Sequence, residues 1–400
     1  MPTPHLHRPQ RGDPPAAQLH DRPRRRGWRL IAGGLAAVAG ACAVAAPAVA
    51  HGDGATVARL QQAVDDVVAA GAPGAAVLVR NGHRSVRLAS GLGRIQPPAP
   101  MRGHDRTRIG GVTKSFTATV VLQLAAEGRL RLGDRVERWL PGTLVNGGAI
   151  TIRQLLNHTS GVFNCSMDPR VVAPYEAGDL THVSDPALCL QVAAEHGPQF
   201  APGTRLDYSN TNFLLLSMIA ERATGRPFAD ELRSRIFIPL GLRHTSYETR
   251  SEIAGAHTHG YVLNDDGPFD VTALSPSLFG PAGAILSNAD DLARFYRALL
   301  RGGLLPAPLL QAMRTVDPVA TGGVPDVGIL GGGWGLGLLR EQFPCGTAWG
   351  HDAENPGYMT AAWSDGDGAR QVVVVVNTHQ DHDGPVSAAM RDLLTLAYCG

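Results

Sequence analysis

The chain after residue 50 begins with alternating helical and strand-like patterns of apolar residues. Residues 55–70 carry apolar side chains three or four positions apart, at Val57, Leu60, Val64, Val67 and Val68, which predicts an amphipathic helix. Two apolar runs, 75–79 and 85–88, flank Asn81-Gly82, a strong signal for a β-hairpin turn. Residues 112–126 again have helical spacing, and Gly128 is typical of a helix C-terminus.

The last part of the chain has the pattern of strands followed by a helix. Residues 347–350, 358–363 and 371–377 are predicted strands, and 388–396 is a predicted helix. Residues 372–376 are valine throughout, as expected for a strand that is covered on both faces.

The order of these segments predicts an α+β fold with a helical insertion. Mainly helical and loop-like segments separate the first helix and hairpin from the last strands and helix. We therefore expect an antiparallel sheet flanked by helices, in a lobe formed by about 51–135 and 275–400. A mainly helical lobe at about 136–274 would be inserted into it. The expected mature unit, 51–400, is long enough to bury one large core or two lobes.

Residues 1–50 have the pattern of a signal peptide. Arg24, Arg25, Arg26 and Arg29 precede an apolar run over 30–49, and Ala48-Val49-Ala50 is a small-x-small cleavage sequence. Cleavage would remove seven Arg and two Asp and change the net charge from +1 to −4. No basic patch then indicates a nucleic-acid partner. We expect a secreted, extracellular protein on the cell-wall side, without a stable membrane span after cleavage; a retained anchor is the alternative.

Four cysteines follow the predicted cleavage site: Cys165, Cys189, Cys345 and Cys399. An even number in an exported chain indicates disulfides. Three pairings are open. We favour Cys165–Cys189 and Cys345–Cys399, since each pair falls within one stretch of the chain; four free buried thiols are the alternative.

Lys114 is the only lysine, and the other 35 of the 36 basic residues are arginine. Arginine stays charged at any working pH, whereas the pKa of a lysine shifts readily on burial. We therefore expect Lys114 at a position where an amine must lose its proton. With Gly111 it would lie in the first turn of the predicted helix, where backbone N–H groups lack partners within the helix.

Three segments together resemble a known family: Gly111-Val112-Thr113-Lys114, Tyr208-Ser209-Asn210 and Gly350-His351-Asp352-Ala353. They are similar to the S-x-x-K, Y-x-N and K/H-x-G motifs of the serine β-lactamase and penicillin-binding superfamily. The nearest branch comprises class C β-lactamases, D-alanyl-D-alanine carboxypeptidases, and related esterases and D-amino peptidases. Further segments support the resemblance, which covers about 55–398; they are 151–161, 200–203, 239–242, 283–287 and 334–337. It implies a β-lactamase/transpeptidase-like fold.

The resemblance also implies a role for each site residue. Lys114 would be the base, and Tyr208 would pass the proton between the nucleophile and the leaving group. Asn210 would orient the substrate amide, and His351 would hold the position often occupied by lysine. The backbone N–H groups of residues 111 and Glu354 would form the oxyanion hole.

Three residues depart from the family pattern. Gly111 stands where the nucleophilic serine is expected, so no acyl-enzyme can form there, although the backbone N–H is retained. Asp352 replaces a hydroxyl that helps to hold a free carboxylate, and it would repel such a group. Ala353 adds a methyl where the backbone lies close to the ligand. We expect no replacement nucleophile from Ser115, which is turned about 100° around the helix from Lys114, or from Ser160 or Ser209.

These observations leave an enzymatic and a binding hypothesis. The chain resembles a secreted serine hydrolase of the carboxypeptidase, β-lactamase or esterase type that is inactive or severely impaired at Gly111. The alternative is a natural pseudoenzyme that binds peptidoglycan stem peptides or another acyl ligand without cleaving it. Residual activation of water by Lys114 and Tyr208 would leave at most a trace of turnover. We expect a small peptide, acyl or β-lactam ligand, no cofactor and no metal; His379, Asp381, His382 and Asp383 are expected to form a solvated loop.

Overall fold

The structure is a computed structural model that describes residues 54–264, 266–320, 333–379 and 384–400. These residues all belong to one compact unit, which spans 49–400. The predicted signal peptide, 1–50, lies outside the described residues. The division of the unit into two lobes stays a prediction.

An antiparallel sheet forms the centre of the fold, and it joins the two ends of the described chain. Within the described residues it has eight strands in the order β3-β2-β1-β13-β12-β11-β10-β9. Their bounds are β1 Gly74–Asn81, β2 Arg84–Arg94, β3 Ala99–Pro100, β9 Gly333–Trp334, β10 Leu339–Phe343, β11 Gly346–Asn355, β12 Tyr358–Ser364 and β13 Arg370–Val376. The predicted hairpin is formed by β1 and β2, and β1 also pairs with β13, with Ala75 opposite Val376.

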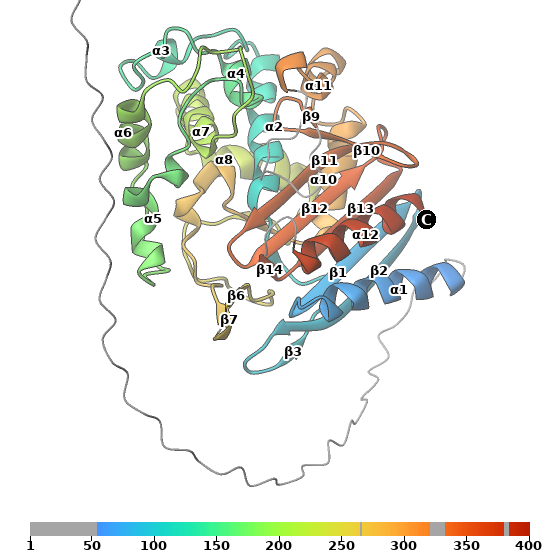
Figure 1. The fold of residues 1–400 in the computed structure, drawn as a ribbon. Helices are drawn as coiled ribbons and strands as arrows, with labels where there is room; N and C mark the ends of the chain where they lie inside the picture. The colour runs from blue at the N-terminus through green and yellow to red at the C-terminus, as the bar shows by residue number, and fades with distance from the viewer. Residues whose placement is uncertain (1–53, 265, 321–332, 380–383) are drawn as a thin grey trace, which may run out of the picture. The chain divides into compact units, whose positions relative to one another are not determined.

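Helices cover both faces of this sheet (Figure 1). Helices α1 (Gly54–Ala69) and α12 (Pro385–Cys399) lie across one face, where they pack on Val372, Val374 and Val376. Helices α2 (Thr113–Ala126) and α10 (Ala289–Leu300) cover the opposite face, which contains Val373. The alternation of side chains along β13 therefore supplies both cores, as its uninterrupted valines predict.

The middle of the chain is mainly helical. Its helices are α3 Val136–Trp139, α4 Ile152–Leu156, α5 Pro169–Glu176, α6 Pro186–His196, α7 Asn210–Thr224, α8 Phe228–Leu232 and α9 Ile238–Leu240, and α11 (Ala307–Arg314) follows α10. Helix α2 is buried on all sides along most of its length, and α7 packs against it. A helix without a polar face belongs inside a protein, so α2 links the sheet to the helical region.

Short strands are the main element that the sequence analysis missed. They are β4 Thr107–Arg108, β5 Ser246–Tyr247, β6 Tyr261–Asn264, β7 Gly267–Asp270, β8 Ile285–Ser287 and β14 Thr378–His379. They form small sheets in the orders β14-β6-β7 and β4-β8-β5. Of these, β5, β6 and β7 lie within 136–275, where mostly helical and loop-like structure was expected. Strands of two to four residues are too short for a recognisable alternation.

Disulfides close two segments of the fold. Cys165 is bonded to Cys189, across 24 residues of sequence, and Cys345 to Cys399, across 54 residues. The first bridge ties the turn 165–167 to α6, and the second ties the loop between β10 and β11 to the end of α12. Among the residues that the structure describes, no helix is both long enough and apolar enough to span a membrane.

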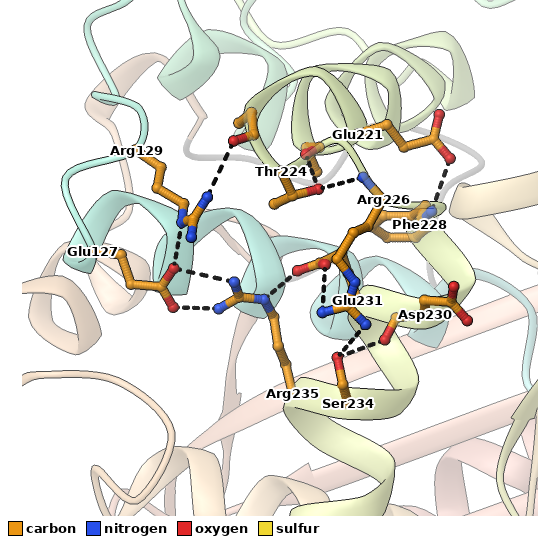
Figure 2. Close-up of polar contacts among 12 residues, drawn as sticks. Glu127, Arg129, Glu221, Thr224, Arg226, Phe228, Asp230, Glu231, Ser234 and Arg235 are labelled. Atoms are coloured by element: carbon orange, nitrogen blue, oxygen red, sulfur yellow. Dashed lines mark hydrogen bonds and ion pairs between the residues drawn. The ribbon is translucent and has the colours of Figure 1, made fainter.

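A network of ion pairs fixes the C-terminal end of α2 against the helical region (Figure 2). Glu231 in α8 is fully buried and pairs with Arg226 and with Arg235. Arg235 also binds Glu127 at the end of α2, with Nη2 3.1 Å from Oε2. Arg129 donates to the same carboxylate from 3.0 Å. The network thus anchors the end of α2 remote from Gly111.

Candidate active site

Gly111 lies in a tight turn that leads from β4 into α2. Residues 110–112 form one turn of 3-10 helix, and α2 begins at Thr113. Gly111 was expected in the first turn of this helix, but the helix begins two residues after it. Lys114 does lie in the first turn. Gly110 has φ of +50°, where glycine is favoured, whereas Gly111 does not lie in this left-handed region.

The space beside Gly111 would accept a side chain. An ideal Cβ at this position lies 3.4 Å from His351 Cε1, 3.4 Å from Lys114 Nζ and 3.5 Å from Ala353 Cβ. These are ordinary van der Waals distances. The backbone and its surroundings are thus compatible with a residue such as serine, whose hydroxyl would extend from this Cβ beside the amine.

Lys114 is buried, with 1% of its surface exposed. Its Nζ donates to Tyr208 Oη at 2.5 Å and to the carbonyl of Ala282 at 3.0 Å. Burial lowers the pKa of Lys114 to about 7, because the charged form loses its hydration. The lowered pKa makes the unprotonated amine accessible near neutral pH, as a base requires.

Tyr208 connects Lys114 to Asn210. Its hydroxyl donates to Asn210 Oδ1 at 2.9 Å, and Asn210 Nδ2 donates to Ser166 Oγ at 3.0 Å. Burial, followed by the charge of Asp352, raises the pKa of Tyr208 above its usual range. The phenol therefore stays protonated and is placed to pass a proton rather than to hold a negative charge.

The third motif lies inside a strand and not at its end. The strand predicted to end at residue 350 continues to Asn355 as β11. His351 and Ala353 face Gly111 across the α2 side of the sheet. Asp352 is buried and lies opposite Ala361, which belongs to the core under α1 and α12. The side chain of Asp352 is therefore on the other face of the sheet.

His351 is buried and uncharged. Burial, followed by the charge of Lys114, lowers the pKa of His351 to about 3. Its Nδ1 approaches the carbonyl of Asp352, while Nε2 is buried without a hydrogen-bond partner among the described residues. The imidazole beside Gly111 is therefore neutral and places no second positive charge next to Lys114.

Strand β11 extends past its pairing with β10 beside the site. Strand β10 pairs with β11 only as far as Gly350, which lies opposite Leu339. Within the described part of the chain, residues 351–355 have a neighbouring strand on the β12 side alone. Glu354, whose backbone N–H is the expected second oxyanion donor, lies in this part of β11 and lines the cleft described next.

A cleft of about 510 Å³ lies in front of these groups. Most of the expected site residues line it, together with loop residues near 163 and 279; the lining is Gly111, Lys114, Val162, Phe163, Asn164, Ser166, Met167, Gln199, Asp207, Tyr208, Asn210, Phe279, Ala282, Glu354 and Asn355. His351, Asp352 and Ala353 lie behind this lining. Asn164 and Ser166 were not identified from the sequence, where they follow the matching segment 151–161 without a motif of their own.

His158 is a further residue whose role was not predicted. It has φ of +58°, which is rare for a residue other than glycine and often accompanies a functional constraint. Its carbonyl accepts from Asp207 N–H at 2.9 Å, and its Nδ1 accepts from Ser209 N–H at 3.1 Å. The ring stacks on Tyr208 with a centroid distance of 4.7 Å. His158 thus holds both chain neighbours of Tyr208 and one face of its ring.

The serines considered as replacement nucleophiles have other partners. Ser115 Oγ donates to the carbonyl of Gly337 at 2.8 Å and accepts from Tyr296. Ser209 Oγ donates to the carbonyl of Phe163 at 3.2 Å, and Ser160 Oγ donates to Asn212 at 2.7 Å. All three are buried, and none lines the cleft. Their hydroxyls therefore have structural roles.

The described residues contain no group of three or more His, Cys, Asp or Glu side chains that could hold a metal ion. His379 is described, and its Nε2 lies 3.4 Å from Glu354. Asp381, His382 and Asp383, which were expected in a solvated loop, lie outside the described residues. The chemistry of the described site consists of a buried amine, a phenol, an amide and backbone donors.

Known proteins share this architecture. The sequence model of the family described as Beta-lactamase matches residues 58–397. Penicillin-binding protein 4 of Amycolatopsis lactamdurans is 31% identical over 305 residues, which cover 72% of this chain and 76% of that protein. Esterase EstB of Burkholderia gladioli is 28% identical, with coverage of 79% and 89%.

A solved structure agrees with these matches. The D-stereospecific amidohydrolase from a Streptomyces species superimposes with a TM-score of 0.76 at 36% identity, covering 87% of this chain and 99% of that one. The β-lactamase/transpeptidase-like α+β fold and the likeness to serine hydrolases expected from the three motifs are therefore confirmed. With a match that spans nearly all of its described residues, the chain belongs to the Beta-lactamase family, within the superfamily of serine β-lactamases and penicillin-binding proteins.

Proposed function

We propose that this protein is a secreted, acyl-binding member of the family in which Gly111 occupies the nucleophile position and normal turnover through an acyl-enzyme is lost. The observation that carries the proposal is the site around Gly111. A Cβ there would lie 3.4 Å from Lys114 Nζ, and Nζ is 2.5 Å from Tyr208 Oη. A base and a proton carrier thus flank a position that lacks only the Cβ and hydroxyl of serine.

The charges of the cleft support a neutral or cationic acyl ligand. Asp207 and Glu354 are its carboxylates and Lys114 is its basic residue, and no arginine is among the described residues that line it. Asp352, from which repulsion was expected, does not contribute, because its side chain lies on the other face of the sheet; the negative charge at the cleft comes from Asp207 and Glu354. A ligand with a free carboxylate would therefore meet repulsion, which favours esters, amides and amine-bearing peptides over carboxypeptidase substrates.

The experiment is to restore the hydroxyl with Gly111→Ser and to expose the full chain to an aryl ester, a D-amino acid amide and a labelled penicillin. Gly111→Ala is the matched control, because it adds the Cβ without the hydroxyl. We expect Gly111→Ser to turn over at least one probe through an acyl group on the introduced serine, whereas Gly111→Ala should show no repeated turnover. Absence of covalent labelling of a folded Gly111→Ser protein by all three probes would refute the proposal.

A second candidate is a natural pseudoenzyme that binds a peptidoglycan stem peptide or a related acyl ligand without cleaving it. Ala353 favours it, since its methyl lies 3.5 Å from the Cβ position of Gly111 and so narrows the same space. Isothermal calorimetry of the unaltered chain with stem peptides and their D-amino acid amides tests this function. Heat of binding that disappears in Asn210→Ala is expected, whereas no binding by the unaltered chain would contradict it.

A further inference from the structure

Gly111 leaves room for a methyl-sized group in van der Waals contact with the only lysine side chain of the sequence. The position of its missing Cβ is 3.4 Å from Lys114 Nζ, and Gly111 and Lys114 both line the cleft. A serine would fill this space with Cβ and Oγ and would itself attack the ligand. Without that side chain, the carbonyl group of a ligand in the cleft can lie against Gly111 Cα and approach Nζ; a separation of about 3–3.5 Å is that of atoms ready to react.

We propose that Lys114 is itself an acylation site: its Nζ attacks the carbonyl carbon of an activated acyl ligand in the cleft and retains the acyl group as an amide. The ligand class is uncharged aryl esters and thioesters. This inference rests on the acyl-binding cleft proposed above, but it needs no residue other than those that the chain already has.

The hydrogen bonds of Lys114 fit a nucleophilic amine. A neutral amine has two N–H groups and one lone pair. Tyr208 Oη at 2.5 Å and the carbonyl of Ala282 at 3.0 Å account for both N–H groups. The lone pair is then the part of Nζ that these two hydrogen bonds leave available for a ligand. Burial lowers the pKa of Lys114 to about 7, so the neutral form predominates at mildly alkaline pH.

The proposed step conserves atoms and charge. The Nζ lone pair forms a C–N bond, and the carbonyl electrons move to oxygen, where the backbone N–H of Gly111 is a donor. The C–O bond of an ester then breaks. Tyr208 accepts a proton from the former amine and gives its own proton to the leaving oxygen. The product is an Nε-acyl lysine, and because an amide resists hydrolysis far better than an ester, each protein molecule reacts once.

The presence of a single lysine makes the test unambiguous. The full chain is incubated with p-nitrophenyl acetate at pH 8, and acetyl groups are located by peptide mass spectrometry. We expect one acetyl group on Lys114, formed at least about tenfold faster than on the N-terminal amine because the bound ester is held next to Nζ. Lys114→Met should take up none at this peptide. Gly111→Ala should react more slowly, because its methyl fills the space beside Nζ.

The outcomes separate this inference from the proposed function. Lys114 acetylated no faster than the N-terminal amine, or equally fast in Gly111→Ala, overturns the inference, since reaction would then follow exposure and not the site. If the lysine inference is overturned but the Gly111→Ser protein is labelled on its introduced serine, the proposed function still stands. Rapid acetylation of Lys114 without any labelling of the Gly111→Ser protein would uphold the lysine site and contradict the serine-hydrolase proposal.

Discussion

Replacement of Lys114 by methionine should stabilise the protein at neutral pH and destabilise it at high pH. The lysine is fully buried, and its pKa falls from 10.5 to about 7 on folding. The unfolded chain therefore binds more protons than the folded chain between these two values. Stability then rises with pH across this window, and the lysine's cost is greatest below pH 7.

The magnitude follows from these two pKa values. Linkage gives a cost of about 4 kcal/mol at pH 7 and about 2 kcal/mol at pH 9 relative to a permanently neutral amine. Methionine removes this cost but leaves the carbonyl of Ala282 and the oxygen of Tyr208 without the donor that they have now. Such a loss costs about 1–3 kcal/mol. Lys114→Met should thus be more stable than the unaltered protein at pH 7 and lose this advantage near pH 9.

Urea unfolding at pH 7, 8 and 9, followed by circular dichroism with the disulfides intact, measures this difference. Only the difference between the two proteins is used, so that other titrating groups cancel. Lys114→Arg is the matched control, because its charge cannot be lost, and it should be less stable than the unaltered protein at every pH. A constant difference between Lys114→Met and the unaltered protein from pH 7 to 9 would refute the lowered pKa of Lys114.

Three further predictions concern the ion network, Tyr208 and the disulfides. Glu231→Gln should lower the unfolding free energy by about 3–5 kcal/mol, because Glu231 is a fully buried ion-pair partner. Glu195→Gln, at an exposed ion pair, should have a much smaller effect, and equal losses in urea titrations would contradict this. In the Gly111→Ser background, His158→Ala should reduce the acylation rate at saturating ester about 10–100-fold with little change in ester affinity, because Tyr208, the proton carrier, is no longer held in position. His158→Asn should recover part of the lost rate. A loss of ester affinity alone would argue against a positioning role. Double Cys→Ser replacement should lower the unfolding free energy by about 3 kcal/mol at Cys165–Cys189 and by about 4 kcal/mol at Cys345–Cys399, because the longer loop gains more entropy when it is opened. A larger loss of thermal stability at Cys165–Cys189 than at Cys345–Cys399 would contradict this dependence on loop length.

The elements that could be predicted from the sequence are those whose pattern is local. Helix α2 and strand β13 have long apolar runs, and the Asn81-Gly82 turn has a well-defined hairpin signal. Strand β11 was cut short because its buried residues 351 and 352 are His and Asp, so burial and polarity disagree there. Polar residues inside a strand are characteristic of sites, and they interrupt the apolar pattern on which the prediction depends.

The parts of the site that were missed depend on contacts between distant segments. His158 acts on residues 207–209, about 50 positions away. Ser166 reaches Asn210 across 44 positions. Neither contact leaves a periodic signal, since it is produced by the packing of loops against the start of α7. The three motifs could be found because their spacing is shared with a family, whereas the residues that hold them in place had no such mark.

The location of the acyl group in the Gly111→Ser protein is the most direct test of the account. After brief reaction with an aryl ester and acid quenching, peptide mass spectrometry should find one acyl group on the serine introduced at position 111 and none on Ser115, Ser160, Ser166 or Ser209. The same map of the unaltered chain should show no acylated serine. A folded Gly111→Ser protein that stays unlabelled, or that carries its acyl group on another serine, would contradict the assignment of Gly111 to the nucleophile position.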